Sequence, residues 1–185
     1  MINDVMNDAD AKMGKSVEAT REEFATIRAG RANPAMFAKI TADYYGTQTP
    51  LQQLASFTSQ DARTILIQPF DVGAMGAIEK SIRDSDLGVN PANDGKVLRC
   101  VFPDLSEERR KEYIKVARHK AEEARVAARN IRRTAIDQLK KAQKDKEISE
   151  DDLSRAEKNL DVVTKTHTDK IDELLKHKEA ELLEV

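Results

Sequence analysis

The sequence feature that most constrains the fold is an alanine-rich seam between residues 114 and 142. Small and aliphatic residues recur there at spacings of three and four, the pattern of one face of a long α-helix. The seam consists of Ile114, Ala117, Ala121, Ala124, Ala128, Ile131, Ala135, Leu139 and Ala142. Alanine lets neighbouring helices approach closely, so the seam predicts a helix packed against partner helices. We expect Ser106 to cap its start and the helix to continue to about Lys144.

Two further segments show the same spacing. The first covers residues 2–27 and stops at Gly30, and the second follows Ser149, which is a candidate N-cap with Asp152 three residues later. The first seam is Met6, Ala9, Met13, Ser16, Thr20, Phe24 and Ile27, and the last is Leu153, Ala156, Leu160, Val163, His167, Ile171, Leu174 and Leu182. None of the three helices has an apolar face wide enough to be stable alone. We therefore expect a long antiparallel three-helix bundle.

The stretch between the first and second helices has a different pattern. Alternating segments such as KITADYY and RTILIQPF are punctuated by glycine and proline, which is typical of strands and turns. A short helix is expected near residues 74–83, and a closing strand at 96–102. The fold class is therefore α+β: residues 1–30 with 104–185 form a discontinuous bundle, and residues 31–103 form an inserted small β/α/β domain.

Composition and charge limit the possible functions. Charged residues make up 35% of the 185, yet the formal net charge is only -2, so any nucleic-acid binding must come from a local patch. The single cysteine, Cys100, excludes an intramolecular disulfide and is expected to be buried. No stretch approaches the roughly 20 apolar residues that span a membrane, and the amino terminus does not look like a targeting signal. We expect a soluble, cytoplasmic protein.

The sequence offers no arrangement for catalysis. His119, His167 and His177 are not spaced as metal ligands, and there is no phosphate-binding glycine loop or nucleophile elbow. His167 is expected in the core, and the other two histidines in solvent. We expect no enzymatic activity, no cofactor and no metal.

Arginines give the strongest functional signal. Residues 107–133 contain ten Lys or Arg against five Asp or Glu, whereas residues 134–185 contain ten against fourteen. On a helical wheel, Lys111, Arg118, Arg125, Arg129 and Arg132 fall within about 60° of one another, and Arg133 lies slightly further round. Arginine suits phosphate oxygens, and the lack of clustered aromatics favours shape and phosphate recognition of folded RNA. The basic surface extends to Arg21 and Arg28, which flank the first seam.

An alternative stays open for the same stripe. Charged stripes on helices commonly face solvent or pair with acids on a neighbouring helix, and Glu122 lies on this face. In that case the chain is a helical scaffold or chaperone-like module that binds a partner protein. Such binding would be insensitive to salt, whereas binding to RNA phosphates weakens as salt rises, so the salt dependence of binding separates the two hypotheses.

Several segments together resemble the ribosome recycling factor family. They are IRAGRANP at 27–34, YYGTQTPLQQLAS at 44–56, PFD at 69–71, SDLGVNP at 85–91, LSEERRKEYIK at 105–115 and EEARVAARNIRR at 122–133. The resemblance runs the length of the chain and agrees with the helix, insertion, helix, helix order. Two departures are Thr134, where the family commonly has an acid, and Ala29, where a threonine is frequent.

The resemblance implies an L-shaped protein with dimensions similar to transfer RNA. It implies binding to the post-termination ribosome and, with elongation factor G and its GTP hydrolysis, splitting into subunits with release of mRNA and tRNA. The expected partners are the RNA of the large ribosomal subunit and elongation factor G, with no DNA or membrane, and the chain is expected to be a monomer.

The resemblance also implies residue roles. RNA contacts carry over to Arg28, Arg31, Arg110, Arg125, Arg129, Arg132 and Arg133. We place the hinge of the inserted domain at Gly30, Arg31, Pro103, Asp104 and Leu105, with the glycine providing backbone freedom.

Overall fold

The structure, a computed structural model, describes residues 1–184 and contains two compact units. One unit comprises Met1–Phe24 and Lys115–Glu179, and the other comprises Ala25–Ile114 and the residues from Ala180 onward. These groupings divide the long helices near their ends. The domain boundaries expected at residues 30/31 and 103/104 therefore stay a prediction.

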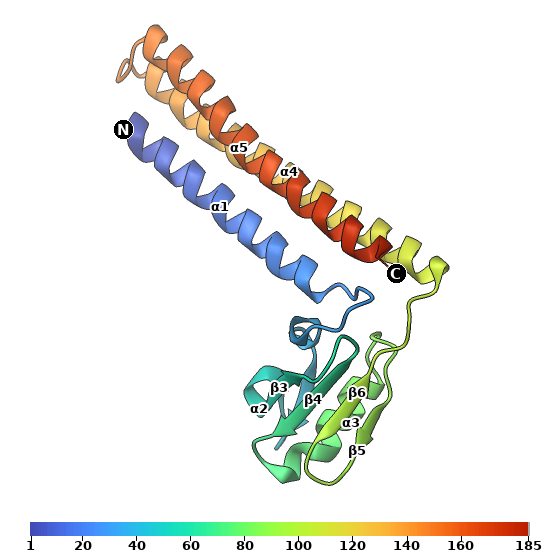
Figure 1. Ribbon diagram of the computed structural model, residues 1–185. Coiled ribbons are helices and arrows are strands. Elements are labelled where there is room, and N and C mark those ends of the chain that lie inside the picture. The colour runs from blue at the N-terminus through green and yellow to red at the C-terminus, as the bar shows by residue number, and fades with distance from the viewer. Residues whose placement is uncertain (185) are drawn as a thin grey trace. The chain divides into compact units, whose positions relative to one another are not determined.

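The first unit is built from three long helices, α1 (Ile2–Thr26), α4 (Glu107–Lys144) and α5 (Glu150–Leu183). Helices α4 and α5 form an antiparallel pair joined by a short turn, and α1 runs antiparallel to α4 (Figure 1). All three contribute side chains to the core, as in the cluster of Ala9, Ala135 and Leu160. The predicted three-helix arrangement is confirmed.

The caps of the two later helices form as predicted. The Ser106 hydroxyl accepts a hydrogen bond from the Arg109 backbone N–H at 3.1 Å. At the start of α5, the Asp152 N–H donates to the Ser149 hydroxyl at 3.0 Å, and the Ser149 N–H donates to the Asp152 carboxylate at 3.3 Å. This reciprocal pair is a capping box, which satisfies two N–H groups that have no partner within the helix.

The buried positions differ from the predicted seams at several places, and two of them are informative. Val17 is buried and Ser16 only half-buried, and Thr164 is buried while Val163 is half-buried. Thr164 can lie inside because its hydroxyl donates to the Leu160 carbonyl oxygen at 2.8 Å. The strict alternation of three and four assumed for the seams does not follow the rotation of 3.6 residues per turn at every position.

The second unit contains a hairpin and a four-stranded sheet. Strands β1 (Thr41–Tyr44) and β2 (Thr47–Pro50) form the hairpin, and β3 (Ala55–Ser59), β4 (Thr64–Pro69), β6 (Leu98–Val101) and β5 (Pro91–Asn93) form the antiparallel sheet in that order. Helix α3 (Met75–Arg83) lies between β4 and β5 in the chain, and α2 (Leu51–Leu54) precedes β3. Two short 3₁₀ helices cover Pro34–Phe37 and Val72–Ala74. The predicted strands and helix of this region are confirmed.

Larger side chains fill the core of the second unit. Phe37, Ile65 and Ile78 are completely buried, and the rings of Phe37 and Phe102 meet edge to face at 5.9 Å between centroids. Cys100 is completely buried among them, and this burial raises the pKa of its thiol to about 12. The thiol is therefore a protonated, small apolar side chain, as predicted.

The described part of the chain contains no helix that is long and apolar enough to cross a membrane. Within residues 1–184 there is also no group of three or more His, Cys, Asp or Glu side chains that could hold a metal ion. His167 lies in the bundle core, as predicted, where its Nε2 is 2.6 Å from the Asp10 carboxylate. His119 is exposed and lies 2.8 Å from Glu123 on the next turn of α4.

Candidate nucleic-acid interface

The candidate interface is a row of arginines on α4, which we call the arginine row. It lies beside the buried alanines, which hold α4 against its neighbours and thereby fix the direction of the row. It consists of Arg118, Arg125, Arg129, Arg132 and Arg133.

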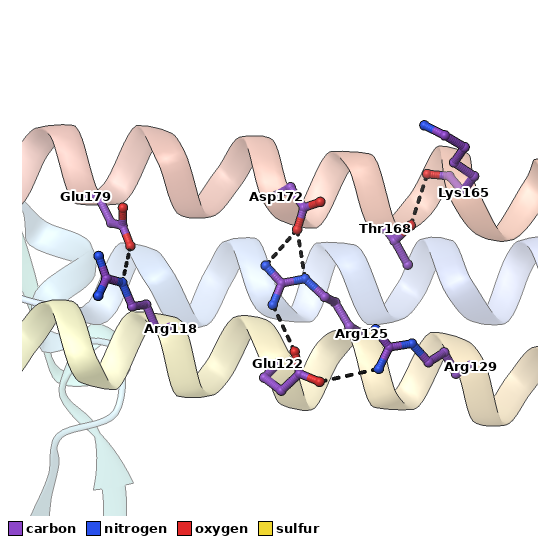
Figure 2. A network of polar contacts seen from close by, with 8 residues as sticks. All are labelled: Arg118, Glu122, Arg125, Arg129, Lys165, Thr168, Asp172 and Glu179. Carbon is purple, nitrogen blue, oxygen red and sulfur yellow. Dashed lines mark hydrogen bonds and ion pairs between the residues drawn. The ribbon is translucent and has the colours of Figure 1, made fainter.

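Three members of the arginine row bond to carboxylates on α5. The Nε of Arg118 donates to Glu179, that of Arg125 to Asp172, and that of Arg132 to Asp161, each at 2.7 Å. Figure 2 shows the first two of these pairs bridging the two helices. The alternative expectation, that the stripe pairs with acids on a neighbouring helix, therefore describes the geometry of these three arginines.

Glu122, on α4 itself, connects Arg125 to a further position of the row, Arg129. One of its carboxylate oxygens accepts from Arg125 at 3.1 Å, and the other accepts from Arg129 at 3.3 Å (Figure 2). Arg133 is exposed and, in the part of the chain that the structure describes, forms no ion pair. The network thus sets five arginines against four carboxylates, an excess of one positive charge.

These pairs do not prevent a role in RNA binding. The side chain of Arg132 is 39% exposed and that of Asp161 is 57% exposed, so the pair lies in water. Exposed ion pairs contribute only about 0 to 1 kcal/mol to stability and can be exchanged. A phosphate, which accepts the same hydrogen bonds as a carboxylate, can therefore bind to the remaining donors or take the place of Asp161.

Arg28 differs from the arginine row. Its side chain is only 6% exposed, and its guanidinium donates to the carbonyl oxygens of Leu87, at 3.2 Å, and Pro103. It also lies over the Phe102 ring, 5.4 Å from the centroid, and its burial lowers its pKa from the ordinary value. The guanidinium is turned to backbone carbonyls inside the second unit, and the expected RNA contact of Arg28 stays a prediction.

The other two predicted RNA contacts of the second unit differ in exposure. Arg31 is exposed, and its side chain is free to meet a ligand in solvent. Arg110 is half-buried, and its Nε is buried without a hydrogen-bond partner among the described residues. Both remain predicted contacts.

Three of the five predicted hinge residues are tied to their surroundings. Asp104 forms an ion pair with Arg63, Leu105 is 6% exposed, and the Pro103 carbonyl accepts from Arg28. Gly30 does not adopt a left-handed backbone, and a Cβ there would meet the Glu184 carbonyl oxygen at 3.6 Å, an ordinary contact. The conformation observed does not itself require glycine at this position, and the backbone freedom expected of Gly30 stays a prediction.

The α5 carboxylates were the part of the site that sequence reasoning missed. Asp172 and Glu179 are seven residues apart, the same interval that separates Arg125 from Arg118. In two antiparallel helices such matched intervals bring oppositely charged residues together, so the signal was available. Arg28 had a weaker signal, because the residue before it, Ile27, is itself a seam position.

Comparison with known proteins identifies the family. A family model described as ribosome recycling factor matches residues 20–183. The ribosome-recycling factors of Nocardioides sp. and Cutibacterium acnes are 72% and 62% identical to this chain, over the full length of both proteins in each case. The chain belongs to the ribosome recycling factor family.

Solved structures agree with this assignment. The solution structure of a ribosome recycling factor is 37% identical, with a TM-score of 0.76, and covers 100% of this chain and 98% of its own. A second similar chain comes from models for the T. thermophilus ribosome recycling factor and the E. coli elongation factor G bound to the E. coli post-termination complex. It is 44% identical, with a TM-score of 0.69 and full coverage of both chains.

Proposed function

We propose that this chain binds the post-termination ribosome and, with elongation factor G and GTP hydrolysis by that partner, splits it into subunits. Messenger RNA and transfer RNA are released for a new round of translation. The observation that carries the proposal is the family match over residues 20–183, supported by relatives at 57–72% identity over the whole chain. The choice of partners is supported by the similar chain that is bound, together with elongation factor G, to a post-termination complex.

Anchoring on the large subunit is assigned to one end of the arginine row. Arg129, Arg132 and Arg133 supply guanidinium groups to the phosphates of ribosomal RNA, and Arg31 and Arg110 add contacts from the second unit. Exposure supports this assignment: Arg133 and Arg31 face solvent, and Arg129 is 57% exposed. Arginine forms charge-assisted, fork-like hydrogen bonds with phosphate oxygens, which suits this role.

Movement is assigned to the inserted domain, residues 31–103, which turns about Gly30–Arg31 and Pro103–Leu105 relative to the bundle of residues 1–30 and 104–185. The chain itself performs no catalysis and carries no cofactor, since hydrolysis belongs to the G-protein partner. It acts as a monomer in the cytoplasm, where ribosomes work. Two connections between the domains restrict the motion to roughly one axis.

The test is a subunit-splitting assay on post-termination ribosomes, followed by light scattering, with elongation factor G and GTP present. The wild-type chain should split ribosomes, and Arg129→Ala/Arg132→Ala should need a concentration about tenfold higher for half the maximal rate, a loss of about 1.4 kcal/mol. Arg155→Ala is the matched control, because Arg155 is an exposed α5 arginine outside the row. Absence of splitting by the wild-type chain would refute the proposed function.

The hinge is tested in the same assay. Gly30→Pro fixes the backbone of one connection and also restricts the residue before it. This variant should bind large subunits normally but fail to split ribosomes. Normal splitting by a variant whose folding is confirmed by circular dichroism rules out a hinge at this connection.

A further inference from the structure

Within the arginine row, Arg125 is bonded differently from its neighbours. Each of its three nitrogens contacts a carboxylate: Nε donates a hydrogen bond to Asp172 at 2.7 Å, Nη2 forms an ion pair with the same carboxylate at 2.6 Å, and Nη1 donates to Glu122 at 3.1 Å. Its side chain is only 21% exposed, and Figure 2 shows it lying between the two helices. Arg125 therefore already has two anionic partners, on opposite sides of its guanidinium group.

The two terminal nitrogens of Arg132 are available to a ligand. Arg132 bonds to Asp161 through Nε alone, and in residues 1–184 neither of its terminal nitrogens has a hydrogen-bond partner. Arg129 likewise uses one nitrogen, Nη1, for Glu122. Since a phosphate is bound best by two parallel N–H groups, these two arginines can accept one without losing their existing bonds.

The charge pattern of α5 changes along the row. Going from Arg118 to Arg125 moves the α5 partner by seven residues, from Glu179 to Asp172. The next step of seven leads from Arg125 to Arg132 and would place residue 165 opposite it, but residue 165 is a lysine, which is exposed and bonds to Asp169. Arg132 reaches one turn further, to Asp161.

The two ends of the row consequently differ in charge. Arg118 and Arg125 are matched one to one by Glu179 and Asp172, so this end is neutral. The other end has three arginines, Arg129, Arg132 and Arg133, and two carboxylates, Asp161 and Glu122, of which Glu122 is shared with Arg125. Positive charge therefore concentrates toward the Arg133 end.

We propose that Asp172 and Glu122 are specificity-determining residues that exclude Arg125 from RNA binding and confine the phosphate contacts beyond it to Arg129, Arg132 and Arg133. This inference rests on the proposed function. A phosphate that approached Arg125 would meet two carboxylates already bound to it, and like charges at such distances repel. The two carboxylates neutralise Arg125 and so shorten the positively charged surface along α4. An unrelated RNA helix that lay along the whole row would meet these negative charges, and the repulsion disfavours its binding.

The experiment compares Arg125→Gln, Arg132→Gln and Asp172→Asn in the full chain. Affinities for large ribosomal subunits and for an unrelated RNA duplex are measured at several salt concentrations, and thermal unfolding checks each variant. Arg125→Gln should leave subunit affinity within about twofold and the salt slope unchanged. Arg132→Gln, the matched change two turns along α4, should weaken subunit binding by about tenfold and lower the slope by about one.

Asp172→Asn tests the exclusion of Arg125 by changing its carboxylate partner instead of the arginine. It leaves Arg125 in place but removes the charge that neutralises it, so affinity for the unrelated duplex should rise several-fold and the salt slope should steepen by about one. This variant decides the question even if Arg125→Gln fails to fold.

The possible results separate the exclusion of Arg125 from the phosphate contact of Arg132. Weakening by Arg125→Gln as large as that by Arg132→Gln, or unchanged duplex affinity in Asp172→Asn, would overturn the exclusion of Arg125 but leave the proposed function intact. If Arg132→Gln changes neither affinity nor slope, the phosphate contact itself is overturned, and the confinement with it.

Discussion

Two regions of the molecule use arginine in opposite ways. Around Arg28, in the second unit, the guanidinium is buried and bonded to the neutral carbonyl oxygens of Leu87 and Pro103. In the arginine row on α4, exposed guanidinium groups such as that of Arg132 bond to carboxylates such as Asp161. Both regions lie in segments that resemble the same family, so sequence similarity alone does not separate them.

The difference teaches that burial and partner type decide what an arginine can do. A buried guanidinium cannot leave its carbonyl partners without removing a hydrogen-bond donor from each of them, so it stabilises the fold. An exposed guanidinium paired with a carboxylate loses little when a phosphate replaces that partner, so it can bind RNA. The two regions should therefore respond differently to the same substitution.

The largest expected effect comes from Arg28→Ala. Removing this side chain leaves the Leu87 and Pro103 carbonyls without their donor and opens space over Phe102, so the free energy of unfolding should fall by about 3 kcal/mol. Urea denaturation measures it. Arg31→Ala, an exposed neighbour, is the control and should change stability by less than about 0.5 kcal/mol. A loss of subunit binding without a loss of stability in Arg28→Ala would return Arg28 to the interface.

Gly88→Ala should have a smaller effect in the same region. Gly88 has a φ of +69°, and an added Cβ would lie 3.6 Å from the Nη1 of Arg28, so the cost is the left-handed backbone of about 1 to 2 kcal/mol. Gly76→Ala in α3 makes a suitable contrast, because its Cβ would meet nothing within 4 Å. Alanine there should stabilise the protein by about 0.5 to 1 kcal/mol. Equal melting temperatures of the two variants would contradict the account of Gly88.

Asp161→Asn should have the smallest effect on stability. The Arg132–Asp161 pair is exposed on both sides, so its loss should change the free energy of unfolding by less than about 1 kcal/mol. The same urea titration used for Arg28→Ala checks it. A loss as large as that of Arg28→Ala would show that the arginine row is a structural feature of the bundle, and the comparison between the two regions would fail.

Much of the fold could be predicted from sequence because its helices repeat a short pattern. The seam of Ala117, Ala121 and Ala124 and the cap at Ser149 depend on residues close in sequence. The predicted strand at residues 96–102 was also found, as Leu98–Val101. Sheet order could not be predicted, because the pairing of β4 with β6 joins strands separated by α3 and β5.

The stripe of arginines on one face of α4 was predictable from sequence, but their complete network of ion pairs with carboxylates was not. Helical spacing placed Arg118, Arg125 and Arg132 on one face of α4. The matched intervals of seven residues indicated the pairing of Arg118 and Arg125 with α5, but the pairing of Arg132 with Asp161 departs from that interval and depended on the register of the two helices. The burial of Arg28 depended in the same way on Leu87 and Pro103, which are 59 and 75 residues away.

The central claim is that the Arg129–Arg133 end of the row binds phosphate. The most direct test measures the affinity of the wild-type chain and of Arg132→Ala for large ribosomal subunits across a series of salt concentrations. We predict that Arg132→Ala weakens binding by about 1 to 3 kcal/mol and lowers the slope of log affinity against log salt by about one. Identical affinities and slopes, with binding insensitive to salt in both, would contradict the claim and favour a helical scaffold that docks on protein.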